Sequence, residues 1–366
     1  MTDQHLEQSL KLTAYFAERQ RSGRRFLAEA MLDLLATRQV ATSVMLRGIA
    51  GFGPERIIRT DASLTLSEDP AVAVTAVDSP GIITELAGDI AAMTGRGLLT
   101  LERARLLDPS PGPAIAVDDL PNGWDAVKLT VYVGRNRRIG GIPAYKAVCD
   151  LLFRHGFAGA TAFLGVDGTA HGLRQRARFV SRNVDVPVMI IAVGSSTQVR
   201  DCAPELTTMI ERPLITVERS RLCKRGGALL AHPPELPDTD PEGRPLWQKL
   251  MVFTPAAAQF GGAPIHRTLV RRLWDSGNAG GATVLRGIWG FHGDHRPHGD
   301  SIRHLSRQVT VMTVIIDTPS TIAASFELVD EVTAQRGLVI SEMVPALLAI
   351  DGDTGHGGTD LASHSY

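Results

Sequence analysis

The chain has 366 residues, a formal net charge of −1 at pH 7 and 21% charged residues. A charge balance so close to neutral argues against a nucleic-acid-binding or membrane-surface protein, and no apolar run reaches the length of a transmembrane helix. The length predicts two or three domains, since domains typically span ~100–200 residues.

Three cysteines without a CxxC spacing, Cys149, Cys202 and Cys223, are typical of reduced thiols. The segment Met1–His5 lacks the features of a signal peptide. Both observations predict a cytoplasmic protein with no membrane insertion.

The first hundred residues predict four strands and two helices. Apolar residues at helical spacing, from Phe26 to Leu35, indicate a helix with one buried stripe. Before the second helix, Ser79 is expected to be the cap and Pro80 the first helical residue. The predicted elements are a strand over 11–17, a helix over 24–37, a strand over 43–49, a loop rich in Gly, Pro and Arg over 50–60, a strand over 71–77, a helix from 80 to about 93 and a strand over 98–107. This β-α-β-β-α-β order is the ferredoxin-like arrangement, in which two helices cover one face of a four-stranded antiparallel sheet.

The same pattern is written three times along the chain. The K-L-T that begins at Lys11 returns at Lys128, 117 residues later, and Gly48 returns as Gly165 at the same interval. The closing strand, L-L-T-L-E-R from residue 98, returns as L-I-T-V-E-R from residue 214. Repeats in one order at a nearly constant spacing indicate that each copy is one structural unit.

A third copy begins at Lys249 and closes with L-V-I-S-E from Leu338. Its V-L-R-G-I-W-G-F at 284–291 nearly repeats the M-L-R-G-I-A-G-F at 45–52. Proline-rich linkers act as extended spacers, and a polar Gly-rich tail is expected to be disordered. The predicted organisation is therefore a first module over 9–108, a linker over 109–124, a degenerate second module over 125–223, a Pro-rich linker over 224–246, a third module over 247–349 and a disordered tail over 350–366.

The central strands of the modules, over 71–77, 186–193 and 309–316, are apolar along their whole length. An antiparallel sheet with one wet face alternates apolar and polar residues. The face away from the helices must therefore also be covered, and another copy of the same sheet is the nearest cover. We expect the modules to pack sheet against sheet.

Five motifs together resemble one known family. They are K-L-T-x-Y in the first strand, L-R-G-I-x-G-F after the second, L-S-E-D-P at 66–70, V-D-S-P at 77–80 and G-L-L-T-L-E at 97–102. On these motifs the chain resembles the PII-like family DUF190, three times over and most clearly in the first module. The resemblance implies the fold of the PII signal-transduction proteins, which are homotrimers that bind nucleotides or other small effectors in clefts between subunits.

The resemblance also implies a regulator without catalytic residues, in which the long loop after the second strand rearranges when the effector binds. Relatives are often encoded beside fluoride exporters, so a membrane transporter is one candidate for the regulated partner. Because one chain here carries three modules, we expect an α+β protein whose modules pack as an intramolecular, monomeric pseudo-trimer.

The glycine spacing after the second strand is the first candidate site. Glycines let backbone N–H groups approach an anion closely, and a neighbouring arginine adds a charge-assisted contact to phosphate. By resemblance this loop holds the effector, for which an adenine nucleotide is a candidate, and an arginine before the last strand faces the same cleft. The alternatives are a loop that only needs positive φ and an exposed turn arginine. The candidate ligand-binding residues are Arg47, Gly48, Gly51, Gly53 and Arg96 in the first module and Arg286, Gly287, Gly290, Gly293 and Arg336 in the third.

The second module departs from this pattern. Leu164 replaces the arginine, D-G-T-A at 167–170 replaces the G-F-G run, and Arg212-Pro213 stands before the last strand. We therefore expect that its cleft has lost this chemistry.

A histidine cluster in the third module is the second candidate site. It contains His292, His295, His298 and His304, with Asp294 and Asp300 between them. Imidazoles at these spacings can surround Zn²⁺ or Ni²⁺. A solvated polar loop is the interpretation that we favour, and a metal site at His292, His295 and His298 is the alternative.

The sequence contains no G-x-S-x-G elbow, Walker lysine or H-E-x-x-H motif, so we expect a protein that is not an enzyme. The leading hypothesis is a PII-like regulator that binds a small anionic effector between modules and signals through the loop after the second strand. The alternatives are a divalent-metal-binding protein of the CutA kind and a scaffold whose clefts have decayed.

Overall fold

The computed structural model describes residues 9–60, 69–107, 124, 126–170, 172–176, 186–211, 213–293, 295–299 and 309–364. It is a mixed α/β structure with six helices and one large antiparallel sheet among these residues. No helix in the described ranges is long and apolar enough to cross a membrane. The first predicted linker lies outside the described residues except for Trp124, and so does residue 125.

The first module pairs its four main strands in the order β4-β6-β1-β7, all antiparallel. A short ribbon precedes its first helix, so that helix begins at Leu27 and not at the predicted Arg24. Ser79 occupies the cap position of the second helix, but its hydroxyl makes no capping hydrogen bond. The elements are β1 (Ser9–Ala17), β2 (Arg21–Ser22), β3 (Arg25–Phe26), α1 (Leu27–Thr37), β4 (Thr42–Phe52), β5 (Arg59–Thr60), β6 (Ala71–Asp78), α2 (Pro80–Met93) and β7 (Arg96–Leu107).

The other two modules repeat this order with additions. The second contains β8 (Ala126–Gly134), β9 (Arg138–Ile139), β10 (Ile142–Pro143), α3 (Ala144–Arg154), β11 (Gly159–Leu164), β12 (Asp167–Ala170), β13 (Leu173–Arg176), β14 (Pro187–Gly194), α4 (Ser196–Met209), β15 (Leu214–Arg225) and β16 (Ala228–Leu229). The third contains β17 (Trp247–Pro255), β18 (Gln259–Phe260), β19 (Ala263–Pro264), α5 (Ile265–Ser276), β20 (Ala282–Arg286), β21 (Trp289–His292), β22 (His298–Gly299), β23 (Thr310–Asp317), α6 (Pro319–Val332), β24 (Leu338–Val344), β25 (Ala346–Asp351) and β26 (Thr354–Gly357).

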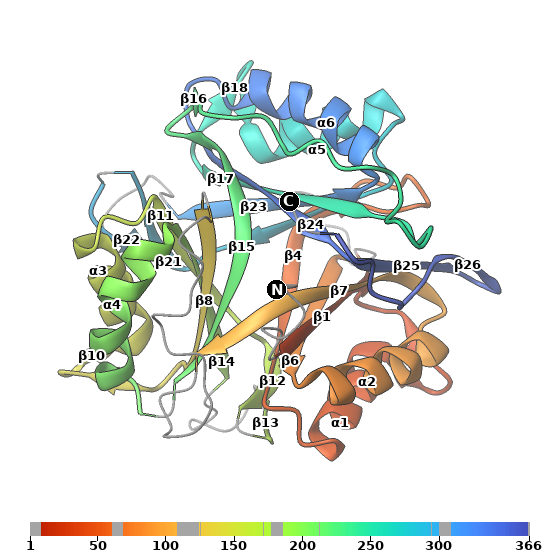
Figure 1. Ribbon diagram of the computed structural model, residues 1–366, viewed down its shortest axis with the longest axis horizontal. Coiled ribbons are helices and arrows are strands. Elements are labelled where there is room, and N and C mark those ends of the chain that lie inside the picture. Colours follow the sequence, from red (N-terminus) through yellow and green to blue (C-terminus); the bar gives the residue numbers. More distant parts are fainter. Residues whose placement is uncertain are drawn as a thin grey trace.

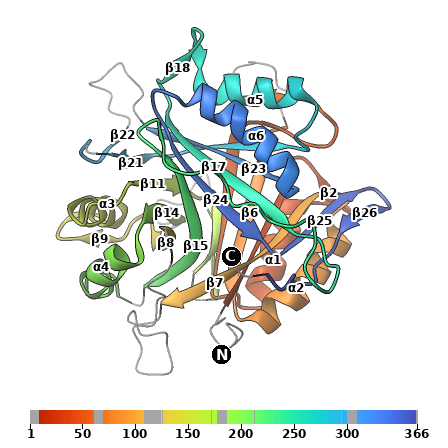
Figure 2. The ribbon, with the colours of Figure 1, turned by 45° about the horizontal axis from the view of Figure 1, so that its top comes forward.

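The three helix pairs lie on the outside of the molecule and the strands face one another inside (Figure 1). The view turned by 45° shows the same three sheet-and-helix units around a shared centre (Figure 2). One apolar cluster lies between the sheet and the helices of each module. A fourth cluster joins residues from all three sheets, among them Val44, Met189 and Met251. The second face of each sheet is therefore buried against the other modules.

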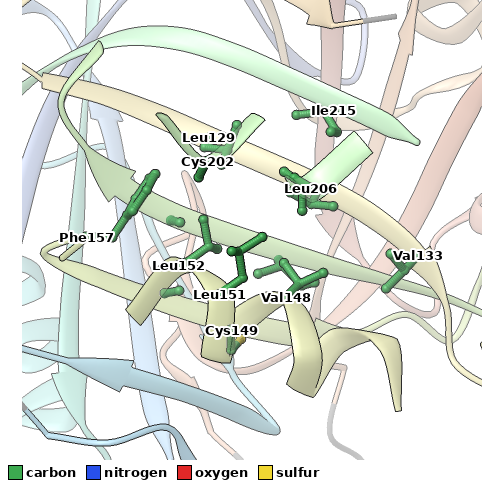
Figure 3. Packing of buried hydrophobic residues seen from close by; sticks show 14 of the residues in the cluster. Leu129, Val133, Val148, Cys149, Leu151, Leu152, Phe157, Cys202, Leu206 and Ile215 are labelled. Atoms are coloured by element: carbon green, nitrogen blue, oxygen red, sulfur yellow. The ribbon is translucent and has the colours of Figure 1, made fainter. Parts of the chain in front are cut away.

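The cluster of the second module shows how its helices are held (Figure 3). Val148, Leu151 and Leu152 on α3 pack with Leu129 and Leu206, and all five side chains are at most 1% exposed. Cys149 and Cys202 belong to this cluster and are free thiols. Burial raises the pKa of Cys202 to about 12, so this thiol remains protonated at neutral pH.

Neighbouring modules are joined by strands that extend from one module into the next. Beyond its own sheet, β4 pairs with β20, β21 pairs with β11, and β12 pairs with β4. The last strands are linked in the same cyclic way, because β7 pairs with β15, β15 with β24, and β25 with β7. Each pair of modules therefore shares two sets of backbone hydrogen bonds, and the circuit of modules is closed.

Glycine is required where these strands cross. A Cβ added at Gly51 would lie 2.4 Å from the Ala282 oxygen, and one at Gly290 would lie 2.2 Å from the Ala160 oxygen. The predicted loop over 50–60 was therefore wrong at its start, because β4 continues to Phe52 as an intermodular strand. Gly168, 117 residues after Gly51, occupies the same position, with its added Cβ 2.2 Å from the Ser43 oxygen. The second module has thus kept the crossing glycine.

The C-terminal tail was expected to be disordered, and the structure corrects this. β25 pairs with the first half of β7, and β26 folds back on β25 as a hairpin. Ala362 is fully buried and its carbonyl accepts a hydrogen bond from Arg103 at 2.7 Å. Composition suggested disorder, but an open strand edge on the first module supplies partners for this backbone.

The boundary expected at residue 223 also falls inside an element, since β15 runs to Arg225. Lys224 is 1% exposed, and its ammonium pairs with Asp330. The second linker therefore begins later than its composition indicated.

Six charged side chains form a closed ring at the centre of the molecule. Each is at most 6% exposed. In each module the lysine lies opposite its own glutamate on paired strands, and it also bridges to the glutamate of a neighbouring module. Lys128, for example, lies 2.9 Å from Glu218 and 2.6 Å from Glu342. Around the ring the order is Lys11, Glu218, Lys128, Glu342, Lys249 and Glu102.

The ring shifts the pKa values of its members. Burial disfavours the charge on Lys11, but the ring carboxylates outweigh it and raise the pKa of that lysine well above its ordinary value. Burial likewise opposes the charge of Glu102, and the lysines hold its pKa well below the usual range. Lys128 is the exception, because burial lowers its pKa more than its two glutamates raise it.

One position on the ring is incomplete. Thr100 donates a hydrogen bond to Glu102 Oε1 at 3.1 Å, and Thr216 makes a longer contact of 3.5 Å with Glu218 Oε1. The third module has Ile340 at the equivalent place, and Glu342 Oε1 is buried without a hydrogen-bond partner among the described residues. A buried acceptor without a partner costs about 1–3 kcal/mol.

Adding one methyl group at a crossing glycine tests the intermodular pairing. We expect Gly290→Ala to destabilise the protein by about 1–3 kcal/mol, because the new Cβ meets backbone that cannot move aside. The control is Gly88→Ala on the exposed side of α2, where an added Cβ meets nothing within 4 Å. This variant should be more stable than the wild type by about 0.5–1 kcal/mol, because alanine loses less conformational entropy in a helix than glycine does. Urea unfolding measures both, and equal midpoints for the two variants would contradict the close approach.

Removing one ring cation should be costly. We expect Lys249→Met to lower the free energy of unfolding by about 3–5 kcal/mol at pH 7, because the buried carboxylates of Glu102 and Glu342 each lose a partner. The control Arg137→Met breaks an exposed pair with Glu211 and should cost less than about 1 kcal/mol.

The loss of stability in Lys249→Met should depend on pH in one direction. The lowered pKa values of Glu102 and Glu342 contribute stability above their unfolded pKa of about 4.3, and this contribution is lost as the pH falls through their folded pKa values. The variant lacks one cause of the lowering. The deficit of the variant in the free energy of unfolding, relative to the wild type, should therefore narrow as the pH falls below about 4.3 toward the folded pKa values, and a deficit that widens there would exclude the ring as its source.

A threonine at position 340 would supply the hydroxyl that the third module lacks beside Glu342. We expect Ile340→Thr to be about 1 kcal/mol more stable than Ile340→Val, because the threonine hydroxyl can donate to Glu342 Oε1. Thr100→Val should in turn destabilise by about 1–3 kcal/mol, since it leaves Glu102 Oε1 without its donor. Chemical denaturation compares the isosteric pairs, and a valine variant more stable than the threonine variant at position 340 would refute the assignment.

Candidate functional site

A cavity of about 550 Å³ lies between the first and third modules. The first module contributes the end of β1, the end of β4 and the start of β7. The third contributes the segment before β20, the end of β23 and the C-terminal β25–β26 hairpin. The site therefore exists only because the two modules are joined by β4 with β20 and by β7 with β25.

The polar part of this largely apolar lining carries charged side chains of both signs. Four arginines face three carboxylates: Arg19, Arg21, Arg59 and Arg96 against Glu55, Asp69 and Asp317. Two of the carboxylates are held by backbone groups, since Asp69 accepts from the Arg19 N–H at 2.6 Å and Asp317 from the Gly280 N–H at 2.8 Å. The excess of cationic donors favours an anionic guest.

Two other donors of the lining lack an acceptor among the described residues. Trp247 Nε1 and Gln20 Nε2 are buried and have no hydrogen-bond partner among the described residues. Both side chains line the cavity, and the Trp247 ring meets His356 of the hairpin edge-on at 5.6 Å. Buried donors without partners are rare and costly, so their presence in a cavity suggests that a ligand supplies acceptors there.

Arg96 connects two segments that meet at the site. Its Nε donates to Asp351 Oδ1 on the hairpin at 2.7 Å, and its Nη1 pairs with Glu55 in the segment after β4. Glu55 also accepts from Arg59 at 2.9 Å. The hydrogen bond from Arg59, with the charge of Arg96, lowers the pKa of Glu55, while Asp351 and Glu55 raise the pKa of Arg96. The arginine side chain is half exposed, so both partners can be exchanged for another anion.

Aromatic side chains form one part of the apolar lining, beside aliphatic residues such as Leu98 and Ile316. Tyr15, Phe16 and Phe52 contribute from the first module, and Trp247 contributes from the third. Flat rings of this kind stack against a planar aromatic ligand. The cavity thus combines an apolar aromatic wall with a cationic rim.

The structure brings some of the predicted ligand residues together and separates others. Gly51, Gly53 and Arg96 line the cavity. Arg47 lies outside it and pairs with Glu18 at 2.7 Å. Gly48 also lies outside, where an added Cβ would be 2.9 Å from the Ala71 oxygen. The repeated glycines are thus explained first by close strand packing.

In the third module, a second cleft of about 690 Å³ contains Arg336 and three histidines. Gly287 and Gly290 are packed against Thr161 and Ala160 of the second module, and Arg286 lies on β20. Gly293 was expected to be the equivalent of Gly53, and this is wrong. The residue equivalent to Gly53 is His292, because each follows the phenylalanine that ends the repeated motif. Gly293 lies one residue later, in the turn after β21, with φ 56°.

The three histidines lie close together in this second cleft. The His292 ring is 5.2 Å from the His295 ring and 5.8 Å from the His298 ring, measured between centroids. Burial, and then the neighbouring His298 and His295 and the charge of Arg336, lowers the pKa of His292 to about 4. His304, Asp294, Asp300 and Arg212 lie outside the described residues.

The ring glutamates form a geometric candidate that the sequence did not suggest. Oxygen atoms of Glu102, Glu218 and Glu342 lie within 4.8 Å of one another, close enough to share a cation. The three ring lysines already occupy the positions between them and neutralise their charge. We therefore interpret the cluster as structural.

Several cavity residues had no recognisable sequence motif. Arg19 and Gln20 lie in a short turn after β1, and His356 lies in the tail expected to be disordered. Asp351, which pairs with Arg96 of the cavity, lies in the same tail. The family resemblance indicated Arg96, but not the partner that the third module brings to it.

Comparison with known proteins supports the triplication. The model of the DUF190 family, described as "Uncharacterized ACR", matches residues 9–106, 126–222 and 247–346, which confirms the resemblance found in the sequence. Solved structures with a weak likeness include the ferredoxin protease FusC in complex with Arabidopsis ferredoxin, at 8% identity over 91% of this chain and 63% of that chain with a TM-score of 0.19. Another is PBCV-1 VP54 fitted into a cryo-EM reconstruction of the virophage Sputnik, at 8% identity over 72% of this chain and 97% of that chain with a TM-score of 0.14. At these TM-scores neither likeness carries an argument.

Proposed function

The chain belongs to the DUF190 family and carries the family's unit three times, and from that premise we propose that it is a PII-like regulatory protein that binds a small anionic effector between its first and third modules. The observation that carries the proposal is the set of donors without acceptors in the 550 Å³ cavity. An adenine nucleotide matches both the aromatic wall and the cationic rim.

We propose further that the three modules take the part of three subunits, as a pseudo-trimer of ferredoxin-like units. The strand order β4-β6-β1-β7 of the first module, with both helices on one face, supports the unit. The cyclic strand exchange and the shared charge ring support the assembly. A single chain then allows each of the three clefts to change independently.

The cleft of the second module supports this divergence. The β12–β13 hairpin lies against β4 of the first module, and Arg174 pairs with Asp167 at 2.7 Å and with Asp33 of the first module. Protein side chains here make the ion pairs that an effector would otherwise make. The cavity between the first and third modules brings together Gly51, Gly53 and Arg96 with Trp247 Nε1 and Gln20 Nε2, two donors that have no partner among the described residues.

The proposed signal passes through Arg96. An anionic group that binds this guanidinium competes with Glu55 and with Asp351. Release of Glu55 frees the segment after β4, and release of Asp351 frees the C-terminal hairpin. Either change alters the surface offered to a regulated partner, for which a membrane transporter is one candidate. The proposal requires no catalytic step.

Thermal-shift titration with ATP, ADP, a cyclic nucleotide and inorganic phosphate tests the site. A nucleotide at 100 times its Kd should stabilise the wild type by about 2.7 kcal/mol. We expect Arg96→Ala to weaken binding about tenfold or more, because a charge-assisted contact is lost. Arg137→Ala, on the exposed surface of the second module, is the matched control.

The outcomes separate the possibilities. Protection by phosphate and nucleotides alike would indicate a general anion site. Protection by nucleotides alone would indicate that the aromatic side chains of the cavity bind the base. If no anion protects the protein, or if Arg96→Ala binds as tightly as the wild type, the proposed function is wrong.

A further inference from the structure

His292, His295 and His298 lie on the β21–β22 hairpin of the third module. His298 on β22 lies next to Gly290 on β21 in the strand register. His292 is two residues further along β21, so it lies diagonally across the same face of the hairpin from His298. The backbone of His292 is held in turn by its pairing with Gly159 of the second module. Two of the three imidazoles are therefore positioned by strand pairing.

The turn between the two strands carries the third imidazole. The His295 N–H donates to the His292 carbonyl at 3.4 Å, and its exposed ring lies 5.2 Å from the His292 ring. The spacing H-x-x-H-x-x-H thus becomes a group of three rings at one end of the hairpin. All three line the same 690 Å³ cleft.

The hydrogen bonding of two of these rings suits a metal ligand. His298 Nδ1 lies 2.8 Å from the Arg296 carbonyl, which selects the tautomer whose Nε2 carries the lone pair. Metal-bound histidines commonly donate their other ring N–H to a backbone carbonyl in this way. His292 Nδ1 is buried without a partner among the described residues, a cost that a shared cation would offset.

We propose that His292, His295 and His298 bind one borderline divalent metal ion, Zn²⁺ or Ni²⁺, at the mouth of this cleft. Three histidines leave a coordination position for water or for a small ligand in the cleft, as in open zinc sites. Among the described residues, only the ring glutamates bring three ligand atoms within 4.8 Å of one another. Binding therefore requires the exposed His295 ring to swing toward the other two.

The site is specific to one module. In the first module Gly53 stands where the third has His292, and the corresponding cleft is lined by arginines. The two clefts would then take ligands of opposite charge, an anion in the first and a cation in the third. This inference does not depend on the proposed effector site.

Isothermal titration of the full chain with Zn²⁺, and separately with Ni²⁺, tests the site. We expect one ion per chain and at least a tenfold loss of affinity in His295→Ala, a substitution at an exposed position that leaves the fold intact. His298→Ala should show the same loss, and His155→Ala, a histidine of the second module beside Glu205, should bind as the wild type does.

Urea midpoints without metal establish that the variants are folded. Quenching of tryptophan fluorescence by Ni²⁺ gives a second readout, because Trp289 lies on the same hairpin. The proposal is overturned if the wild type shows no saturable binding at one ion per chain. It is equally overturned if the His295→Ala, His298→Ala double variant binds as tightly as the wild type.

Discussion

The central ring of lysines and glutamates is the constraint on which the rest of the structure depends. A buried charge is tolerated only when it is paired and hydrogen-bonded. Each lysine here reaches the glutamate of its own module and that of a neighbour, so each buried group obtains its second partner only from another module. Three sheets must therefore converge before every member of the ring has both partners, which favours the closed arrangement over a chain of separate domains.

Backbone pairing between strands also makes the modules depend on one another, away from the central ring. Strands leave one module and enter the sheet of the next, and the crossing points admit no side chain, as Gly51, Gly168 and Gly290 show. These positions are equivalent in all three modules because the geometry of the crossing is the same in each. Substitutions at the centre and at the crossings affect the whole circuit, whereas the clefts between them can change one at a time.

The modules differ in the side chains that they present at these positions. The first cleft presents arginines and donors without partners among the described residues, the second module places its β12–β13 hairpin and the Asp167–Arg174 pair against β4, and the third cleft presents histidines. The C-terminal hairpin adds a further asymmetry, because it brings Asp351 and His356 to the first cleft. A common scaffold thus carries three different chemistries.

The sequence by itself determined the local order. The three-fold repeat, the strands and helices of each copy, and the need to cover both faces of the sheet followed from spacing and apolar pattern. Lys11, Lys128 and Lys249 served as landmarks of the repeat, but their spacing could not reveal that their ammonium groups meet. Only the tertiary structure decided which residues share a cavity, that the glycines mark strand crossings and that the tail is ordered. These features depend on contacts between residues more than a hundred positions apart, such as Arg96 with Asp351, and periodicity describes only neighbours along the chain.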